Sequence, residues 1–246
     1  MTLTVHLFIP CYIDQLFPEV GIATVNILEQ LGCRVIYPPG QTCCGQPAFN
    51  SGYWQETALL AERFLGIFAE AEYLVAPSGS CIAMVKNLYG DLPLSDRIRA
   101  RWQETRSRMF ELSQFLQEVL QVERWEGRFP ARVTYHDACH GLRELRISQY
   151  PRQLLKSIAE LTFVEMERPD TCCGFGGTFS VKFADISTAM VENKAAWIQK
   201  SDAEIVTAID ASCLMHIGGY LRKQHIPVRT MHLAEVLWKA MEGEGE

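Results

Sequence analysis

Two pairs of adjacent cysteines, each followed by a glycine, are the residues of this sequence best suited to chemistry. They occur in "QTCCGQP" at residues 41–47 and in "DTCCGFG" at residues 170–176. Thiolates are soft ligands that suit zinc, copper(I) and iron–sulfur clusters. Neighbouring Cα atoms lie about 3.8 Å apart, so two adjacent thiolates can reach neighbouring atoms of one multinuclear cluster. The doublets therefore point to metal or redox chemistry.

The other cysteines repeat around these doublets. Each half of the chain has the order C, CCG, C, and corresponding cysteines are separated by 128, 129, 129 and 132 residues. The repeated set is Cys11, Cys43, Cys44, Cys81, Cys139, Cys172, Cys173 and Cys213. Only Cys33 falls outside the scheme, and we interpret it as a small buried hydrophobe. So long a period predicts a duplicated domain and not a solenoid.

Strand-like and helix-like segments alternate in the same order in both halves. The segments that read as strands are "LTVHLFIPC", "CRVIYPPG", "EYLVAPSGSC", "ARVTYHDAC", "LTFVEME" and "AEIVTAIDASC". This alternation predicts an α/β fold of two pseudo-symmetric, Rossmann-like halves with mostly parallel sheets. Ligands of such sheets collect at the carboxyl ends of the strands, so the four cysteines of each half should converge there.

We divide the chain into a first half over residues 1–90, a connector over 91–127 and a second half over 128–246. Apolar residues at helical spacing predict that the connector is a long helix that packs against both halves. These residues are Ile98, Trp102, Met109, Leu112, Leu116 and Val119.

Composition excludes several classes of function. The chain has 246 residues, 48% of them hydrophobic, and a net charge of −6, which is not the electrostatic footprint of a nucleic-acid binder. The sequence shows no basic segment followed by a long apolar segment and no apolar run of about 18 residues, so we expect neither a secretory signal nor direct membrane insertion. We expect a cytoplasmic protein, and thiols of a reducing cytosol seldom form structural disulfides.

Further candidate residues lie beside the cysteines. Gly45 and Gly174 permit positive φ and close backbone approach, so that turn N–H groups can point at the sulfurs. Gly176 and Gly177 extend the second of these loops, which we assign to cofactor binding.

The stretch "YHDACHGLR" places His140 and Arg143 just after Cys139. His140 could hydrogen-bond a cluster sulfur, relay a proton or contact a substrate, and Arg143 could bind a carboxylate through two hydrogen bonds. The alternative is a histidine at a helix start and a surface arginine. No counterpart follows Cys11, so the second half is the expected place for catalysis and the first an electron relay.

The pattern C–x(31)–CCG–x(35)–C followed by C–x(32)–CCG–x(38)–C resembles the duplicated cysteine-rich CCG domain family. That family includes the B component of heterodisulfide reductase and the iron–sulfur component of glycolate oxidase. The segments "CCGQPAFNSGY", "VAPSGSC", "CCGFGGTFSVK" and "MHLAEVL" are similar to its lactate-utilization branch. The resemblance implies an iron–sulfur electron-transfer subunit of a system that oxidises L-lactate to pyruvate. It further implies one or two [4Fe–4S] clusters per chain and, as partners, lactate utilization proteins B and C.

The sequence departs from one relative at two positions. The heterodisulfide reductase protein ends each domain in CxxC, which gives five cysteines for a non-cubane cluster. Here Ser78 and Asp210 replace the earlier cysteine, so an ordinary [4Fe–4S] cluster and one with an oxygen ligand are both open. Two other functions also stay open: a zinc-stabilised scaffold that assembles redox partners, and a thiol–disulfide reductase that uses the CCG pairs.

Overall fold

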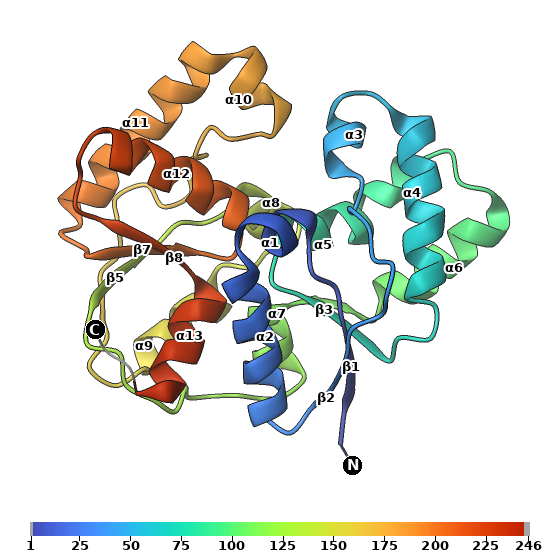
Figure 1. The fold of residues 1–246 in the computed structure, drawn as a ribbon, viewed down its shortest axis with the longest axis horizontal. Helices are drawn as coiled ribbons and strands as arrows, with labels where there is room; N and C mark the ends of the chain where they lie inside the picture. Colours follow the sequence, from blue (N-terminus) through green and yellow to red (C-terminus); the bar gives the residue numbers. More distant parts are fainter. Residues whose placement is uncertain (1, 244–246) are drawn as a thin grey trace.

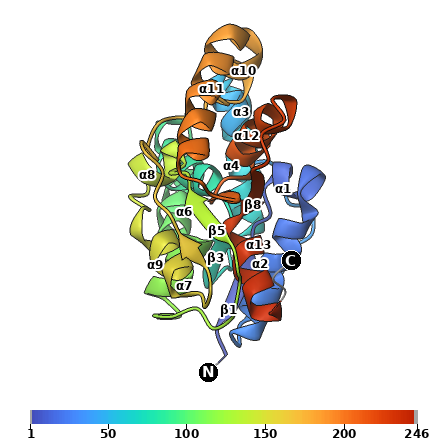
Figure 2. The same cartoon turned by 90° about the vertical axis from the view of Figure 1, so that its left-hand side faces the viewer.

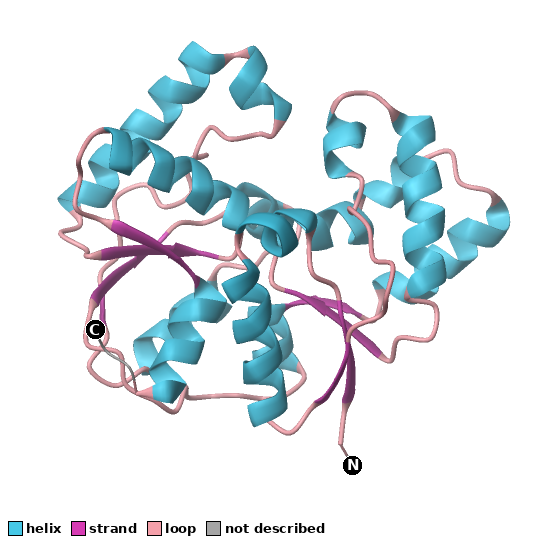
Figure 3. Cartoon of the chain, viewed as in Figure 1, coloured by secondary structure: helices cyan, strands magenta, loops and turns pink. Residues whose placement is uncertain are grey.

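A computed structural model describes residues 2–243 of the chain. It contains two four-stranded sheets in which every strand pair is parallel (Figure 3). The first sheet has the order β2-β1-β3-β4 and is built from β1 (Thr4–Leu7), β2 (Arg34–Ile36), β3 (Tyr73–Ala76) and β4 (Met109–Glu111). The second has the order β6-β5-β7-β8, from β5 (Arg132–Tyr135), β6 (Thr162–Phe163), β7 (Ile205–Ala208) and β8 (Arg229–His232). The α/β prediction with two repeated halves is confirmed.

Helices connect the strands in the same order in both halves. The first half holds α1 (Cys11–Leu16), α2 (Pro18–Gln30), α3 (Gln46–Asn50), α4 (Trp54–Ile67), α5 (Gly79–Lys86), the 3₁₀ turn η1 (Leu88–Asp91), α6 (Asp96–Arg106) and α7 (Leu112–Glu118). The second holds α8 (Cys139–Arg143), α9 (Gln149–Ser157), α10 (Thr178–Lys182), α11 (Ala184–Lys200), α12 (Ala211–Lys223) and α13 (Leu233–Glu242). None of the helices within residues 2–243 combines the length and apolar composition needed to cross a bilayer.

A second apolar cluster lies within the first half, and the larger apolar core is shared by the two halves. Helices α2, α7, α9 and α13 lie between the two sheets, and α2 packs beside α13 (Figures 1 and 2). Fully buried residues of both central strands, Val5 and Leu7 in β1 and Val133 and Tyr135 in β5, belong to this core. Burial of so much apolar surface stabilises the contact between the halves and fixes the two sheets relative to each other.

The prediction of one long connector helix is wrong. Residues 91–127 contain α6, β4 and α7, and β4 pairs with β3 as the fourth strand of the first sheet. Glu111 ends β4 and accepts hydrogen bonds from the backbone N–H groups of Ser113 and Gln114, which starts a new helix there. Apolar spacing could not separate these elements, because β4 and α7 both face the core. The division at residues 90 and 127 itself stays a prediction.

The cysteines lie slightly beyond the positions that the sequence pattern predicts. We expected Cys11, Cys81, Cys139 and Cys213 to end strands, but each strand stops several residues earlier. Cys11 and Cys139 open α1 and α8, and the other two occupy the third position of α5 and α12. Each therefore lies in the first turn of a helix, just outside the carboxyl end of its sheet.

Candidate metal centre

All eight repeated cysteines line one cavity of about 340 Å³. We call Cys11, Cys43, Cys44 and Cys81 the first quartet, and Cys139, Cys172, Cys173 and Cys213 the second. Each quartet combines two cysteines from helix starts with a doublet from the loop that follows the outer strand β2 or β6. The repeated halves thus present their cysteines to one shared space, which the sequence alone did not predict.

Sulfur atoms within the first quartet lie close together in pairs. Cys11 Sγ is 3.7 Å from Cys43 Sγ, and Cys44 Sγ is 3.5 Å from Cys81 Sγ. Two thiolates on one tetrahedral metal atom with bonds of about 2.3 Å lie roughly 3.8 Å apart. The spacing of these donors therefore fits a thiolate-bound metal.

The second quartet has the same arrangement. Cys172 interacts with the thiols of Cys139 and Cys173, and Cys173 also interacts with Cys213. This succession of thiol contacts matches the one that runs from Cys11 to Cys81 in the first quartet. Both quartets provide four soft donors within reach of a single inorganic group.

Each quartet stabilises one thiolate at the first cysteine of its doublet. Hydrogen bonds from the thiols of Cys11 and Cys44, followed by the Gly45 N–H, lower the pKa of Cys43 to about 3. Hydrogen bonds from Cys139 and Cys173, with the Gly174 N–H, lower the pKa of Cys172 to about 2. The thiolate is the form of cysteine that binds metals.

The glycines after the doublets hold these N–H groups in place. Gly45 and Gly174 have φ of +88° and +89°, and each N–H donates to the sulfur of the cysteine two residues earlier at 3.4 Å. A Cβ at Gly174 would lie 2.7 Å from the Ser187 carbonyl oxygen, so no other side chain fits. Gly176 and Gly177 also have positive φ and line the cavity.

The two candidate catalytic residues lie in different surroundings. His140 lines the cavity, with Nδ1 3.6 Å from Cys139 Sγ and Nε2 3.4 Å from Nε2 of Gln46 in the other half. Arg143 is exposed at the end of α8 and is not among the residues that line the cavity. The roles assigned to both residues stay predictions.

Sequence reasoning missed a polar bridge between the halves. The buried Asp210 carboxylate accepts hydrogen bonds from the Ser78 hydroxyl at 2.9 Å, and from the Ser80 hydroxyl at 2.6 Å and backbone N–H at 3.1 Å. Burial raises the pKa of Asp210. The signal lay in the spacing, since Ser78 and Asp210 each precede a quartet cysteine by three residues.

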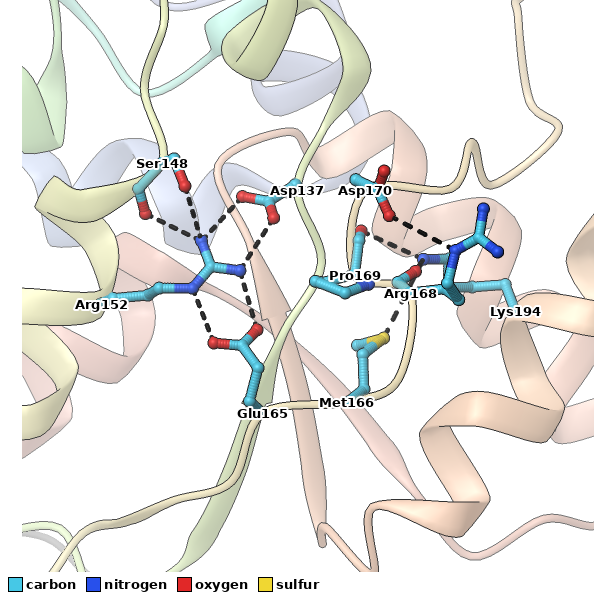
Figure 4. Close-up of polar contacts among 9 residues, drawn as sticks. All are labelled: Asp137, Ser148, Arg152, Glu165, Met166, Arg168, Pro169, Asp170 and Lys194. Atoms are coloured by element: carbon cyan, nitrogen blue, oxygen red, sulfur yellow. Dashed lines mark hydrogen bonds and ion pairs between the residues drawn. The ribbon is translucent and has the colours of Figure 1, made fainter.

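Buried cations anchor the loops of the second quartet, and nothing in the sequence pattern indicated them. Arg152 donates two hydrogen bonds of 2.8 Å to Asp137 and two of 2.8 Å to Glu165 (Figure 4). Lys194 donates to the carbonyl oxygens of Arg168 at 2.9 Å and Pro169 at 3.1 Å. Asp137 lies just before Cys139, and Glu165, Arg168 and Pro169 lie just before Cys172. These contacts therefore fix the backbone that carries both cysteines.

Comparison with solved structures supports the fold. The structure of a hypothetical protein from Helicobacter pylori superposes with a TM-score of 0.67 at 14% sequence identity. The superposition covers 99% of this chain and 49% of that one. At this identity the similarity concerns the fold alone.

Comparison of sequences gives the family. The chain is 49% identical over 236 residues to lactate utilization protein A from Exiguobacterium sp., covering 95% of this chain and 96% of that protein. It is 45% identical over 237 residues to lactate utilization protein A from Halalkalibacterium halodurans, with the same coverage. The sequence model described as the CCG cysteine-rich domain matches twice, at residues 5–86 and 133–218, and each match contains one quartet. The chain therefore belongs to the family of CCG cysteine-rich domain proteins, with two copies of the domain.

Proposed function

We propose that this chain is an iron–sulfur electron-transfer subunit of a system that oxidises L-lactate to pyruvate. The observation that carries the proposal is the convergence of two cysteine quartets on one cavity. The relatives named lactate utilization protein A, similar over nearly the whole chain, support the link to lactate. A cytoplasmic location and lactate utilization proteins B and C as partners belong to the same proposal.

The cofactor that we propose is an iron–sulfur cluster in each quartet, of the [4Fe–4S] type. Four cysteines suffice to hold such a cluster, which supplies one-electron redox chemistry when bound. The Gly45 and Gly174 N–H groups donate to Cys43 and Cys172, as hydrogen bonds to cluster thiolates commonly do. His140 lines the shared cavity, where it can hydrogen-bond Cys139.

A shared cavity suits the passage of electrons between two groups. The bridge from Asp210 to Ser78 and Ser80 links the helix starts that carry Cys213 and Cys81. This contact holds one quartet at a fixed position relative to the other. Fixed donor and acceptor sites need little reorganisation when an electron moves.

A zinc-stabilised scaffold is the second candidate. The spacings of 3.7 and 3.5 Å within the first quartet also suit two thiolates on one tetrahedral ion. Zinc has no redox chemistry of its own, so in that case electrons would pass only through the partners.

The test is a metal analysis of anaerobically purified and reconstituted protein. Iron, acid-labile sulfide and zinc are measured per chain, and EPR spectra are recorded before and after dithionite. About four irons and four sulfides per occupied quartet, with a reducible signal, would support the proposal. Stoichiometric zinc and no iron after reconstitution would overturn it in favour of the scaffold.

A further inference from the structure

His136 is a buried histidine whose ring nitrogens make no hydrogen bond of good geometry among residues 2–243, and the Pro169 backbone is the one weak polar contact of the ring. His136 follows β5 directly and is 0% exposed. Buried polar side chains nearly always have a partner, so this imidazole needs an explanation. Its neighbour in space is the second quartet.

The ring lies close to two cysteines of the second quartet. A ligand nitrogen of His136 and the sulfur atoms of Cys173 and Cys213 all lie within 4.8 Å of one another. A metal forms bonds of about 2.0–2.1 Å to histidine nitrogen and about 2.3 Å to cysteine sulfur. The imidazole is therefore close enough to Cys173 and Cys213 to reach a metal atom of the group that this quartet holds.

The first half shows that the fold does not require a histidine here. Phe8 precedes His136 by 128 residues, the same offset that separates Cys11 from Cys139. Phe8 packs edge-on against Phe64, with ring centroids 4.9 Å apart. An apolar ring thus fills the position in one half, and an unpaired imidazole fills it in the other.

The nearby lysine does not serve as the missing partner. Lys194 follows Phe64 by 130 residues, the same offset that separates the starts of α4 and α11. Its ammonium group donates to the Arg168 and Pro169 carbonyl oxygens. Its third hydrogen bond goes to Met166 Sδ at 3.9 Å, so the ammonium has no proton left to donate to His136.

We propose that His136 is a fifth protein ligand of the second metal site and binds a metal atom of the group that the second quartet holds, next to Cys173 and Cys213. This inference rests on the proposed iron–sulfur function and deepens it, because it makes the two sites chemically unequal. The first site has thiolate ligands alone, and the second mixes thiolate with imidazole.

The experiment looks for the nitrogen directly. Full-length protein is labelled with ¹⁵N-histidine and carries Cys43→Ser, which confines the signal to the second quartet. It is reconstituted anaerobically with iron and sulfide, reduced with dithionite and studied by pulsed EPR. We expect the strong ¹⁵N coupling of a metal-bound imidazole, retained in His140→Gln and lost in His136→Gln. Because ligand loss weakens metal binding, we also expect a chelator to remove iron at least about tenfold faster from His136→Gln.

The outcomes separate this inference from the function on which it rests. Bound iron and sulfide without ¹⁵N coupling would overturn the ligand role of His136 and leave the electron-transfer proposal intact. Coupling that disappears in His140→Gln would assign the nitrogen to His140, whose ring lies 3.6 Å from Cys139 Sγ, and would also overturn the inference. Protein that binds no iron would overturn both. If His136→Gln does not fold, the parent and His140→Gln spectra still distinguish these outcomes.

Discussion

The Asp210 carboxylate of the second half accepts a hydrogen bond from the Ser78 hydroxyl of the first, with 2.9 Å between the oxygen atoms. Each of the two residues stands three positions before a quartet cysteine, Cys213 or Cys81. Equivalent positions of the repeat therefore bond to each other directly at the boundary between the halves. The contact joins the starts of α12 and α5 and fixes how the quartets face each other.

Replacement of Asp210 should weaken the contact between the halves. Asp210→Ala leaves the Ser78 and Ser80 donors without their acceptor, so we expect a loss of about 1–3 kcal/mol in the free energy of unfolding, measured with urea. The exposed Asp185→Ala serves as the control and should change it by less than about 0.5 kcal/mol. Equal stabilities of the two variants would contradict a structural role for the bridge.

Replacement of one doublet cysteine should empty one site. If each quartet holds its own cluster, Cys43→Ser and Cys172→Ser should each remove about half of the iron and sulfide from reconstituted protein. Cys33→Ser is the control, because Cys33 is buried outside both quartets. A single substitution that removes all iron would show instead that the eight cysteines hold one shared group.

Arg152 should be among the most sensitive positions outside the quartets. Its side chain is 8% exposed, and Arg152→Met leaves Asp137 buried without its cation. We expect a loss of about 3–5 kcal/mol in the free energy of unfolding. The pair of Arg128 with Glu160 is 58% and 51% exposed, so Arg128→Met should destabilise the protein far less than Arg152→Met. Similar losses in the two variants would refute this distinction.

A comparison of Gly174→Ala with a control variant separates the cost of backbone strain from the cost of a steric clash. Its control is Gly52→Ala, because Gly52 has a similar φ of +86° and a Cβ added there would meet nothing within 4 Å. Alanine in the left-handed region costs about 1–2 kcal/mol, so the control should lose about that much. Gly174→Ala should lose more, since its Cβ meets the Ser187 carbonyl oxygen, and should also release iron from the second quartet. Thermal unfolding and iron analysis check both expectations.

Glu111 should make stability depend on pH. Burial raises the pKa of this carboxyl from 4.5 to about 7. Between these values the folded state keeps a proton that the unfolded chain has lost, so the wild type loses stability as pH rises through this range. Glu111→Gln cannot titrate, and the side-chain oxygen can still accept from the Ser113 N–H. Its stability relative to the wild type should rise by up to about 3 kcal/mol between pH 4.5 and pH 8. Urea unfolding at both pH values tests this, and a constant difference would contradict it.

Hydrophobic periodicity predicted the duplicated order of elements and the parallel α/β class, because it is a local property of the chain. The same periodicity failed over residues 91–127. There Met109 faces the core from a strand and Leu112 faces it from a helix, and both are fully buried. Apolar spacing alone cannot distinguish the two elements.

The eight cysteines, their arrangement as a repeat and the strands that precede them were determined by the sequence itself. Only the tertiary structure decided that both quartets face one cavity, that Ser78 bonds to Asp210, and that His136 is buried without a hydrogen bond of good geometry among the described residues. All three depend on how α2 and α13 pack the halves together and on which loops then meet. Contacts between residues more than 100 positions apart arise from the packing of whole elements, which no local pattern specifies.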